Sequence, residues 1–136
     1  GAAQVEFDAE HLRRVLVNLL DNALRYMGQE PDSLCLSTGV TAAGQVKLQV
    51  WSDGAPLDKS VERHLFEPFF SSESRSSGLG LYICRELCQR HGASISYQRL
   101  NRPTARGDIG GNAFTVGFRR TTRPADNATL FDTIVV

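Results

Sequence analysis

The chain has 136 residues, enough for one domain with a substantial buried core. Lysine plus arginine and aspartate plus glutamate number 15 each, so the formal net charge is zero and gives no electrostatic reason to expect nucleic acid as a partner. No apolar run reaches the roughly 20 residues of a transmembrane helix, and no signal-peptide pattern opens the chain. The first residue is glycine and the only methionine is Met27, which indicates a domain cut from a longer protein.

The three cysteines, an odd number, argue against a disulfide framework and fit a reducing compartment. Cys84, Cys88 and His91 share one face of a predicted helix, a spacing that a metal ion can use. No second ligand cluster completes a tetrahedral site. We therefore favour the alternative that both cysteines are small buried residues on the inner side of that helix.

A long amphipathic helix is predicted over residues 9–27, because apolar residues recur there at helical spacing after Asp8, a good N-cap. Gly28 and Pro31 end this helix. The elements that follow are a strand at 34–40, a turn at 43–44, an alternating strand at 46–50, a loop at 52–57 and a short helix at 61–66.

Residues 71–77 contain five serines and are expected to be mobile. Gly78 then opens a helix that runs to about Arg90, with Gly92 as its C′ residue. The remaining segments are a strand around 95–97, a polar loop with Arg99, Arg102 and Arg106, a last strand at 113–118 after Gly110 and Gly111, a polar linker at 120–128 and an apolar tail at 130–136. The tail either adds an edge strand or packs on the surface. With so few helices among the strands, a single sheet with helices on one face is favoured.

Asn18, Asn22 and Arg25 line up on one stripe of the first predicted helix, with Tyr26 beside them. A solvated polar face is the plain alternative for any single asparagine. Asparagine is nevertheless a poor helix former, and a pair four residues apart in so apolar a helix indicates a function. Asn22 offers a neutral oxygen to a hard cation, and Arg25 offers a fork for phosphate oxygens.

Two further motifs lie on either side of the predicted serine-rich segment. Gly78 and Gly80 lie where a loop becomes a helix, so backbone amides and the helix dipole favour a phosphate there. The phenylalanine-rich segment 65–70 is either plain core or a set of hinges and plugs for a lid that closes over a ligand.

The order of these motifs resembles the catalytic and ATP-binding domain of bacterial sensor histidine kinases, within the gyrase, Hsp90, kinase and MutL (GHKL) superfamily. Residues 18–26 look like the N box, 65–70 like the F box and 78–81 like the G2 box. Residues 110–114 are similar to the glycine-rich start of the family's last strand. The resemblance covers about residues 5–119, and the run 64–88 is closest to the nitrogen-regulation and type IV pilus-regulation subgroup.

The resemblance implies an α/β (α+β) two-layer sandwich of the Bergerat ATP-binding type. Its sheet is expected to be mixed, with about five strands and with about three helices on one face. Residues 1–119 are expected to form the catalytic domain, and 120–136 a C-terminal linker with an apolar tail.

The resemblance also implies roles for individual residues, with ATP and Mg²⁺ as cofactors. Asn22 would bind Mg²⁺, Arg25 and Tyr26 would contact the nucleotide, and Gly78 and Gly80 would lie against the phosphates. The candidate catalytic residues are Asn18, Asn22 and Arg25, and the candidate nucleotide-binding residues are Tyr26, Ser52, Asp53, Gly54, Arg75, Ser77, Gly78, Leu79, Gly80 and Leu81. ATP hydrolases of the superfamily carry glutamate at the position of Asn18. An asparagine cannot act as a general base, which favours phosphoryl transfer over hydrolysis.

The chain departs from the family in its G1 box, which reads Asp-x-Gly-x-Gly and binds the adenine amino group through its aspartate. The strand alternation places Ser52, and not Asp53, in the inward register. In the same alignment Gly54 matches the first glycine and Pro56 replaces the second. Asp53 would take the role only with a bulge or a deletion, so either residue remains a candidate.

By this resemblance the domain donates the γ-phosphoryl group of ATP to a histidine on its own upstream dimerisation domain, which passes it to a response regulator. No histidine of the chain lies in a phosphoacceptor-like setting, so the fragment is not self-sufficient. It is expected to be cytoplasmic, as part of a longer sensor kinase with or without a membrane anchor, and monomeric in isolation.

Two alternatives use the same fold. A degenerate signalling or docking module that no longer uses nucleotide is supported by Ser52 and Pro56, but the N, F and G2 boxes oppose it. A serine kinase of the anti-sigma type is disfavoured because residues 65–70 look like the F box of histidine kinases.

Overall fold

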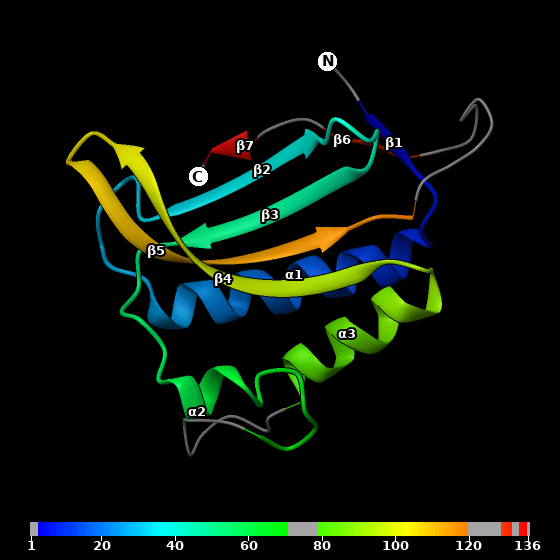
Figure 1. Ribbon diagram of the computed structural model, residues 1–136, viewed down its shortest axis with the longest axis horizontal. Helices are drawn as coiled ribbons and strands as arrows, with labels where there is room; N and C mark the ends of the chain where they lie inside the picture. Colours follow the sequence, from blue (N-terminus) through cyan, green and yellow to red (C-terminus); the bar gives the residue numbers. More distant parts are fainter. Residues whose placement is uncertain (1–2, 71–78, 120–128, 132–133, 136) are drawn as a thin grey trace.

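The computed structural model describes residues 3–70, 79–119, 129–131 and 134–135. Its main sheet and two of its helices form two layers, with α1 and α3 side by side against one face of the sheet (Figure 1). This arrangement confirms the predicted α/β sandwich with its helices on one face. None of the helices in the described part of the chain has the length and apolar character needed to span a membrane.

The elements are as follows, in chain order: β1 (Ala3–Val5), α1 (Ala9–Tyr26), β2 (Leu34–Val40), β3 (Val46–Ser52), α2 (Lys59–Glu62), α3 (Gly80–Arg90), β4 (Ser94–Thr104), β5 (Gly107–Gly117), β6 (Thr129–Phe131) and β7 (Ile134–Val135). The main sheet has the order β4-β5-β3-β2-β7, and β1 pairs separately with β6.

Helix α1 begins as predicted, because the Asp8 carboxylate caps it by accepting a hydrogen bond of 3.0 Å from the His11 amide. Its buried residues recur at helical spacing and face the sheet: Leu12, Val15, Leu19 and Ala23. Helix α3 ends before Gly92, whose φ of +69° is the left-handed conformation expected of a C′ glycine. Helix α2 is shorter than the predicted helix at 61–66, since turns replace it after Glu62.

The expectation of a mixed sheet was wrong for the described strands, because every observed pair is antiparallel. Two of the four ladders in the main sheet are hairpins between consecutive strands, β2 with β3 and β4 with β5, and hairpins are antiparallel by construction. Strand β5 also pairs antiparallel with β3, so the two hairpins lie edge to edge in one sheet.

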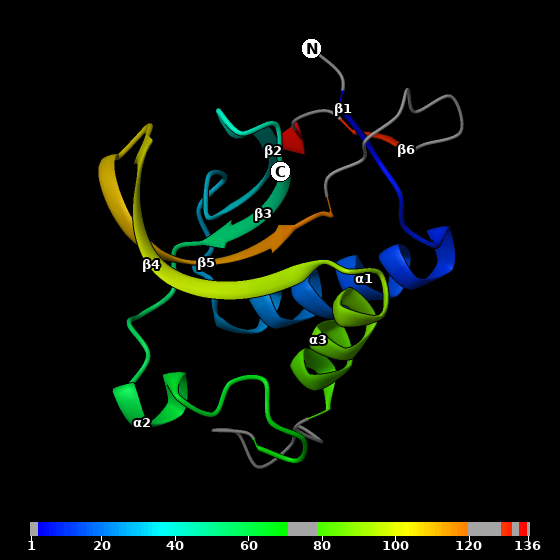
Figure 2. The same ribbon diagram turned by 45° about the vertical axis from the view of Figure 1, so that its right-hand side comes forward.

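The prediction of a polar loop with three arginines was also wrong. Those residues belong to a long hairpin whose ladder runs from the Ser94–Gly117 pair to the Thr104–Gly107 pair. The hairpin curls away from the helices at its tip (Figure 2). Most of its exposed side chains are polar, which resembles a loop in sequence, whereas the backbone pairing that decides the structure leaves no trace in residue type.

The two faces of the sheet are both packed. On the helix face, Leu48 and Val50 of β3 join Phe114 and Val116 of β5 in the main core. The opposite face carries a smaller cluster, in which Leu100 and Ile109 of the hairpin pack against three buried residues: Cys35, Trp51 and Ala113.

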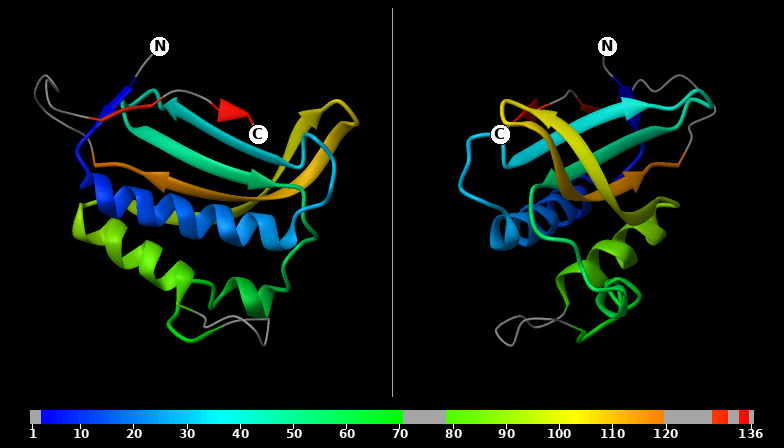
Figure 3. Two further views of the ribbon diagram at one scale, coloured as in Figure 1. Left: turned by 180° about the vertical axis from the view of Figure 1, so that it is seen from behind. Right: turned by 60° about the vertical axis from the view of Figure 1, so that its left-hand side comes forward.

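The described parts of the apolar tail add strands at two edges, which is the first of the two options left by the sequence. Thr129–Phe131 pairs with β1, and Ile134–Val135 pairs with β2 (Figure 3). The predicted linker at 120–128 lies outside the described residues, and the domain boundary at residue 119 stays a prediction.

Candidate nucleotide site

The stripe of asparagines on α1 meets the first turn of α3. The Asn18 side-chain amide lies 3.4 Å from the carbonyl oxygen of Gly80, with the nitrogen as donor. One turn further along α3, the Cys84 thiol lies 3.6 Å from the carbonyl oxygen of Val15. These contacts bring the segments 18–26 and 79–81, far apart in sequence, to one place between the two helices.

The remaining predicted residues of α1 lie further toward its C-terminal end. Asn22 is half-buried, while Arg25 and Tyr26 are exposed. Their side chains therefore remain accessible from solvent on a helix whose opposite side is in the core.

The loop after β3 passes directly against this end of α1. Gly54 is buried, and a Cβ atom there would lie 3.0 Å from the carbonyl oxygen of Tyr26 and 3.2 Å from the Asn112 side-chain nitrogen. Only a glycine lets the two backbones approach so closely without a shift. The predicted Gly54 thus lies at the junction of the β3 loop and the N-box helix.

Two side chains that the sequence analysis did not select hold this loop in place. The Asn112 amide donates a 2.9 Å hydrogen bond to the carbonyl oxygen of Ala55, and the Arg99 guanidinium donates one of 2.6 Å to that of Gly54. Asn112 in turn accepts a 2.6 Å hydrogen bond from the Tyr97 hydroxyl. Asn112 directly follows the Gly110-Gly111 pair, which was the available signal, but its target could only be seen in the fold.

Ser52 and Asp53 point to opposite faces of the sheet. Ser52 has the same strand parity as Leu48 and Val50, so its buried side chain lies on the helix face, opposite Asn112 in the ladder. Asp53, one residue beyond the end of β3, has the parity of Trp51, whose side chain lies on the other face. The register predicted from the alternation is the one observed.

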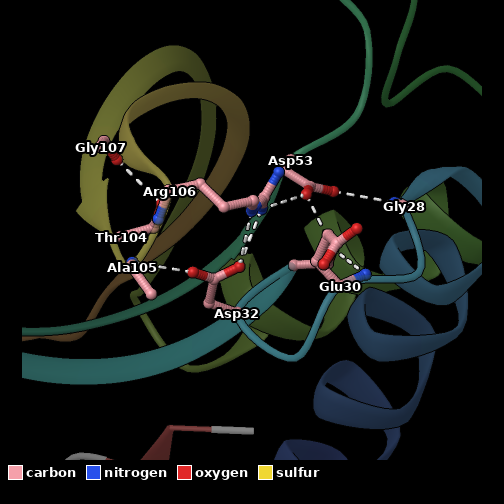
Figure 4. Close-up of polar contacts among 9 residues, drawn as sticks. Gly28, Glu30, Asp32, Asp53, Thr104, Ala105, Arg106 and Gly107 are labelled. Atoms are coloured by element: carbon pink, nitrogen blue, oxygen red, sulfur yellow. Dashed lines mark hydrogen bonds and ion pairs between the residues drawn. The ribbon is translucent and has the colours of Figure 1, made fainter.

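Both oxygens of the Asp53 carboxylate have partners, among them Gly28 after the end of α1 and Arg106 of the hairpin (Figure 4). The carboxylate accepts hydrogen bonds of 2.8 Å from the Gly28 amide and 2.7 Å from the Ser33 hydroxyl, and forms a 2.8 Å ion pair with Arg106. Arg106, at the tip of the β4–β5 hairpin, also pairs with Asp32 at 2.8 Å. Partial burial alone would raise the pKa of Asp53, but these hydrogen bonds and the guanidinium outweigh it and hold the pKa below the usual value.

The glycine-rich segment is described only from Leu79 onward. Gly80 is exposed, and a Cβ atom there would meet nothing within 4 Å. Leu79 precedes the helix, while Leu81 is half-buried and packs against the core. Arg75, Ser77 and Gly78, and with them the predicted mobile segment, lie outside the described residues.

The phenylalanine-rich segment divides between core and surface. Phe66 packs edge-on against Phe114 of β5, with ring centroids 6.2 Å apart. Phe69 is 77% exposed and has a φ of +63°, an uncommon conformation for a residue with a side chain. Phe70 lies beside His64. The plain-core reading is therefore right for Phe66 and not for Phe69.

Cys84 and Cys88 are fully buried between α3 and the core, as favoured over a metal site. Burial raises the pKa of Cys84 to about 12 and that of Cys88 to about 11, so both thiols are protonated and inert at neutral pH. The third member of the predicted trio, His91, contacts His11 instead. Among the described residues, no group of three histidine, cysteine or acidic side chains is arranged to hold a metal ion.

The two-layer sandwich, with α1 in contact with both the start of α3 and the β3 loop, is the arrangement expected of the GHKL class. The chain belongs to the family of histidine kinase-, DNA gyrase B- and HSP90-like ATPases, whose profile matches residues 7–122. The family resemblance read from the motifs is thereby confirmed.

Two curated relatives are sensor proteins. The sensor protein kinase PilS of Pseudomonas aeruginosa is 37% identical over 121 residues, which cover 87% of this chain and 22% of that protein. The sensor protein KdpD of Escherichia coli K12 is 32% identical over 125 residues, which cover 88% of this chain and 13% of that protein. The chain thus spans about a fifth or less of the length of these relatives.

Solved structures show the same fold. The catalytic domain of histidine kinase ThkA superposes with a TM-score of 0.66 at 30% identity, covering 84% of this chain and 69% of that one. The mycobacterial sensor histidine kinase MprB gives the same TM-score at 24% identity, covering 86% of this chain and 78% of that one. The fold is that of histidine kinase catalytic domains.

Proposed function

We propose that this domain binds Mg·ATP and presents the γ-phosphoryl group to a histidine on a separate, upstream dimerisation domain, from which a response regulator would receive it. The observation that carries the proposal is the junction of three motifs. Asn18 on α1 contacts Gly80 at the start of α3, and the β3 loop closes against the end of α1 at Gly54.

The side chains at this junction suit a nucleotide with a hard cation. Asn22 supplies a neutral oxygen, and Mg²⁺ needs few protein ligands because it keeps water and phosphate oxygens. When bound, the ion would neutralise charge on the phosphates. The open space at Gly80 lets a phosphate approach the backbone, and Arg25 offers a fork for its oxygens.

Asn18 favours transfer to a protein group over hydrolysis. Its amide cannot take a proton from water, and in this structure its nitrogen is directed to the Gly80 carbonyl. The contribution of the domain would therefore be positioning and charge neutralisation, with no covalent step on its own residues. A docking module that ignores nucleotide is the competing proposal, and nucleotide binding separates the two.

The test is thermal unfolding with ATP or ADP, with and without Mg²⁺. At a nucleotide concentration about 100 times the Kd, binding should raise the unfolding temperature by roughly 5 to 10 °C. Asn22→Ala should remove the part of this shift that depends on Mg²⁺. Asn101→Ala, the same change on the exposed β4 strand, should keep it. No shift at millimolar nucleotide would reject ATP binding in favour of the docking module.

A further inference from the structure

Ser52 and Asp53, two neighbouring polar residues at the end of β3, differ in whether their side chains already have partners. Asp53 has both carboxylate oxygens occupied: one by the Gly28 amide, the other by the Ser33 hydroxyl and Arg106. Its carboxylate lies between Gly28, just beyond the end of α1, and the tip of the β4–β5 hairpin. Turning it toward the helix face would break an ion pair in which its side chain is only 5% exposed. Asp53 is therefore not available to a nucleotide base.

Ser52 lies on the helix face and is 6% exposed. The described residues provide no hydrogen bond to its hydroxyl, and the neighbouring amide of Asn112 is directed to the Ala55 carbonyl. Gly54, two residues after Ser52, packs against the backbone at the end of α1. Ser52 is thus the polar side chain at the end of β3 that remains free for a ligand bound between the β3 loop and α1.

The chemistry of a hydroxyl differs from that of a carboxylate at this position. An ionised carboxylate only accepts hydrogen bonds, so it selects a purine with an amino donor at position 6 and repels one with an oxo group there. A serine hydroxyl both donates and accepts. Serine is also one bond shorter than aspartate, which leaves space for a water molecule, and water likewise donates and accepts.

Resting on the proposed function, we infer that Ser52 contacts the base and that the site accepts purine nucleoside triphosphates with either an amino or an oxo group at position 6. Asp53 has a different task. Through Arg106 it fastens the β3 loop to the tip of the β4–β5 hairpin. Ser52 is then the residue that sets base selectivity in this chain.

The experiment compares the affinities of ATP and inosine triphosphate, measured by displacement of a fluorescent nucleotide from the whole chain with Mg²⁺. Inosine triphosphate replaces the 6-amino group by an oxo group and leaves the rest of the base unenlarged. For the wild type, we expect the two affinities to agree within about fivefold, as for neutral hydrogen bonds. Ser52→Asp should prefer ATP by roughly 10- to 100-fold, because a charged acceptor then discriminates.

Two further variants separate Ser52 from Asp53. Ser52→Ala should weaken both nucleotides and keep their ratio, and Asp53→Asn should also keep the ratio, whatever it does to stability. The inference is overturned if the wild type prefers ATP by more than about thirtyfold, or if Asp53→Asn shifts the ratio about tenfold. ATP binding without inosine triphosphate binding rejects only this inference, whereas binding of neither nucleotide rejects the proposed function with it. The wild-type ratio decides the matter even if Ser52→Asp does not fold.

Discussion

Gly111 of β5 lies directly against the large side chain of Trp51 on the neighbouring strand β3. A Cβ atom at this position would lie 2.3 Å from Cε2 of Trp51 and 2.4 Å from the carbonyl oxygen of Ser52, and both atoms are buried or in the backbone ladder. Trp51 is also held by a 2.8 Å hydrogen bond from its indole nitrogen to the Leu100 carbonyl oxygen. The ring cannot move aside without losing that bond, so this glycine is required by packing.

Gly111→Ala should therefore destabilise the fold by about 1–3 kcal/mol or more, as overpacking does in a filled core. The free energy of unfolding in urea measures it. Gly39→Ala is the matched control, because a Cβ atom there meets nothing within 4 Å. It should stay within about 0.5 kcal/mol of the wild type. Equal losses in the two variants would contradict the packing argument.

Helices α1 and α3 are antiparallel neighbours, and a histidine pair joins them at the end opposite Gly80. Nδ1 of His11 lies 2.8 Å from Nε2 of His91, and Phe7 packs on the His91 ring with centroids 4.3 Å apart. One nitrogen must donate and the other accept, so the contact requires that not both rings be protonated. Partial burial lowers the pKa of His91 below its usual 6.5, and the His11 charge lowers it further.

This pair predicts a loss of stability on acidification. Because the pKa of His91 is lower in the folded state, its contribution is fully present above the unfolded pKa of 6.5 and is lost as pH falls toward the folded pKa. Arg90 and Arg119 act in the same direction, and Asp8 opposes them. We expect the free energy of unfolding to fall between about pH 7.5 and about pH 5.5.

Chemical unfolding across that pH range measures the effect. His91→Asn should flatten the dependence, since it removes the titrating group while keeping a polar side chain. His64→Asn, in the exposed turn after α2, should retain the fall on acidification. A wild-type slope that survives His91→Asn unchanged would assign the effect to other groups.

At the scale of the whole molecule, the described tail strands are minor partners of the sheet. Strand β7 pairs with β2 through two residues and β6 with β1 through three, whereas β4 and β5 share eleven pairs. Among the residues whose burial the structure describes, the main core is built from those between Val5 and Phe118. The site residues on α1, α3 and the β3 loop do not depend on the tail for their described contacts.

We therefore expect the chain truncated after Arg119 to fold and to keep its nucleotide-dependent thermal shift. Its unfolding temperature should drop by a few degrees, roughly the effect of about 1 kcal/mol, because two short pairings are lost and the edge of β2 is exposed. Circular dichroism melting with and without ATP measures both quantities. A truncated chain that is unfolded at room temperature would place the tail inside the domain and reject the boundary at residue 119.

The sequence by itself determined most of the local elements and the family. Periodicity over α1, its Asp8 cap and the terminal Gly92 depend on neighbours within one or two turns, and such short-range signals are written in residue type. The inward register of Ser52 follows from alternation within a single strand for the same reason.

Only the tertiary structure decided which residues distant in sequence contact one another. One example is the long β4–β5 hairpin. Others are the hydrogen bonds of Asn112 and Arg99 to the β3 loop and the ion pair of Arg106 with Asp53, which join residues at least 45 positions apart. Such contacts depend on backbone pairing and chain topology, which residue type does not encode locally. The sequence therefore placed Ser52 and Asp53 side by side as candidates. The fold separated them by giving the carboxylate another partner.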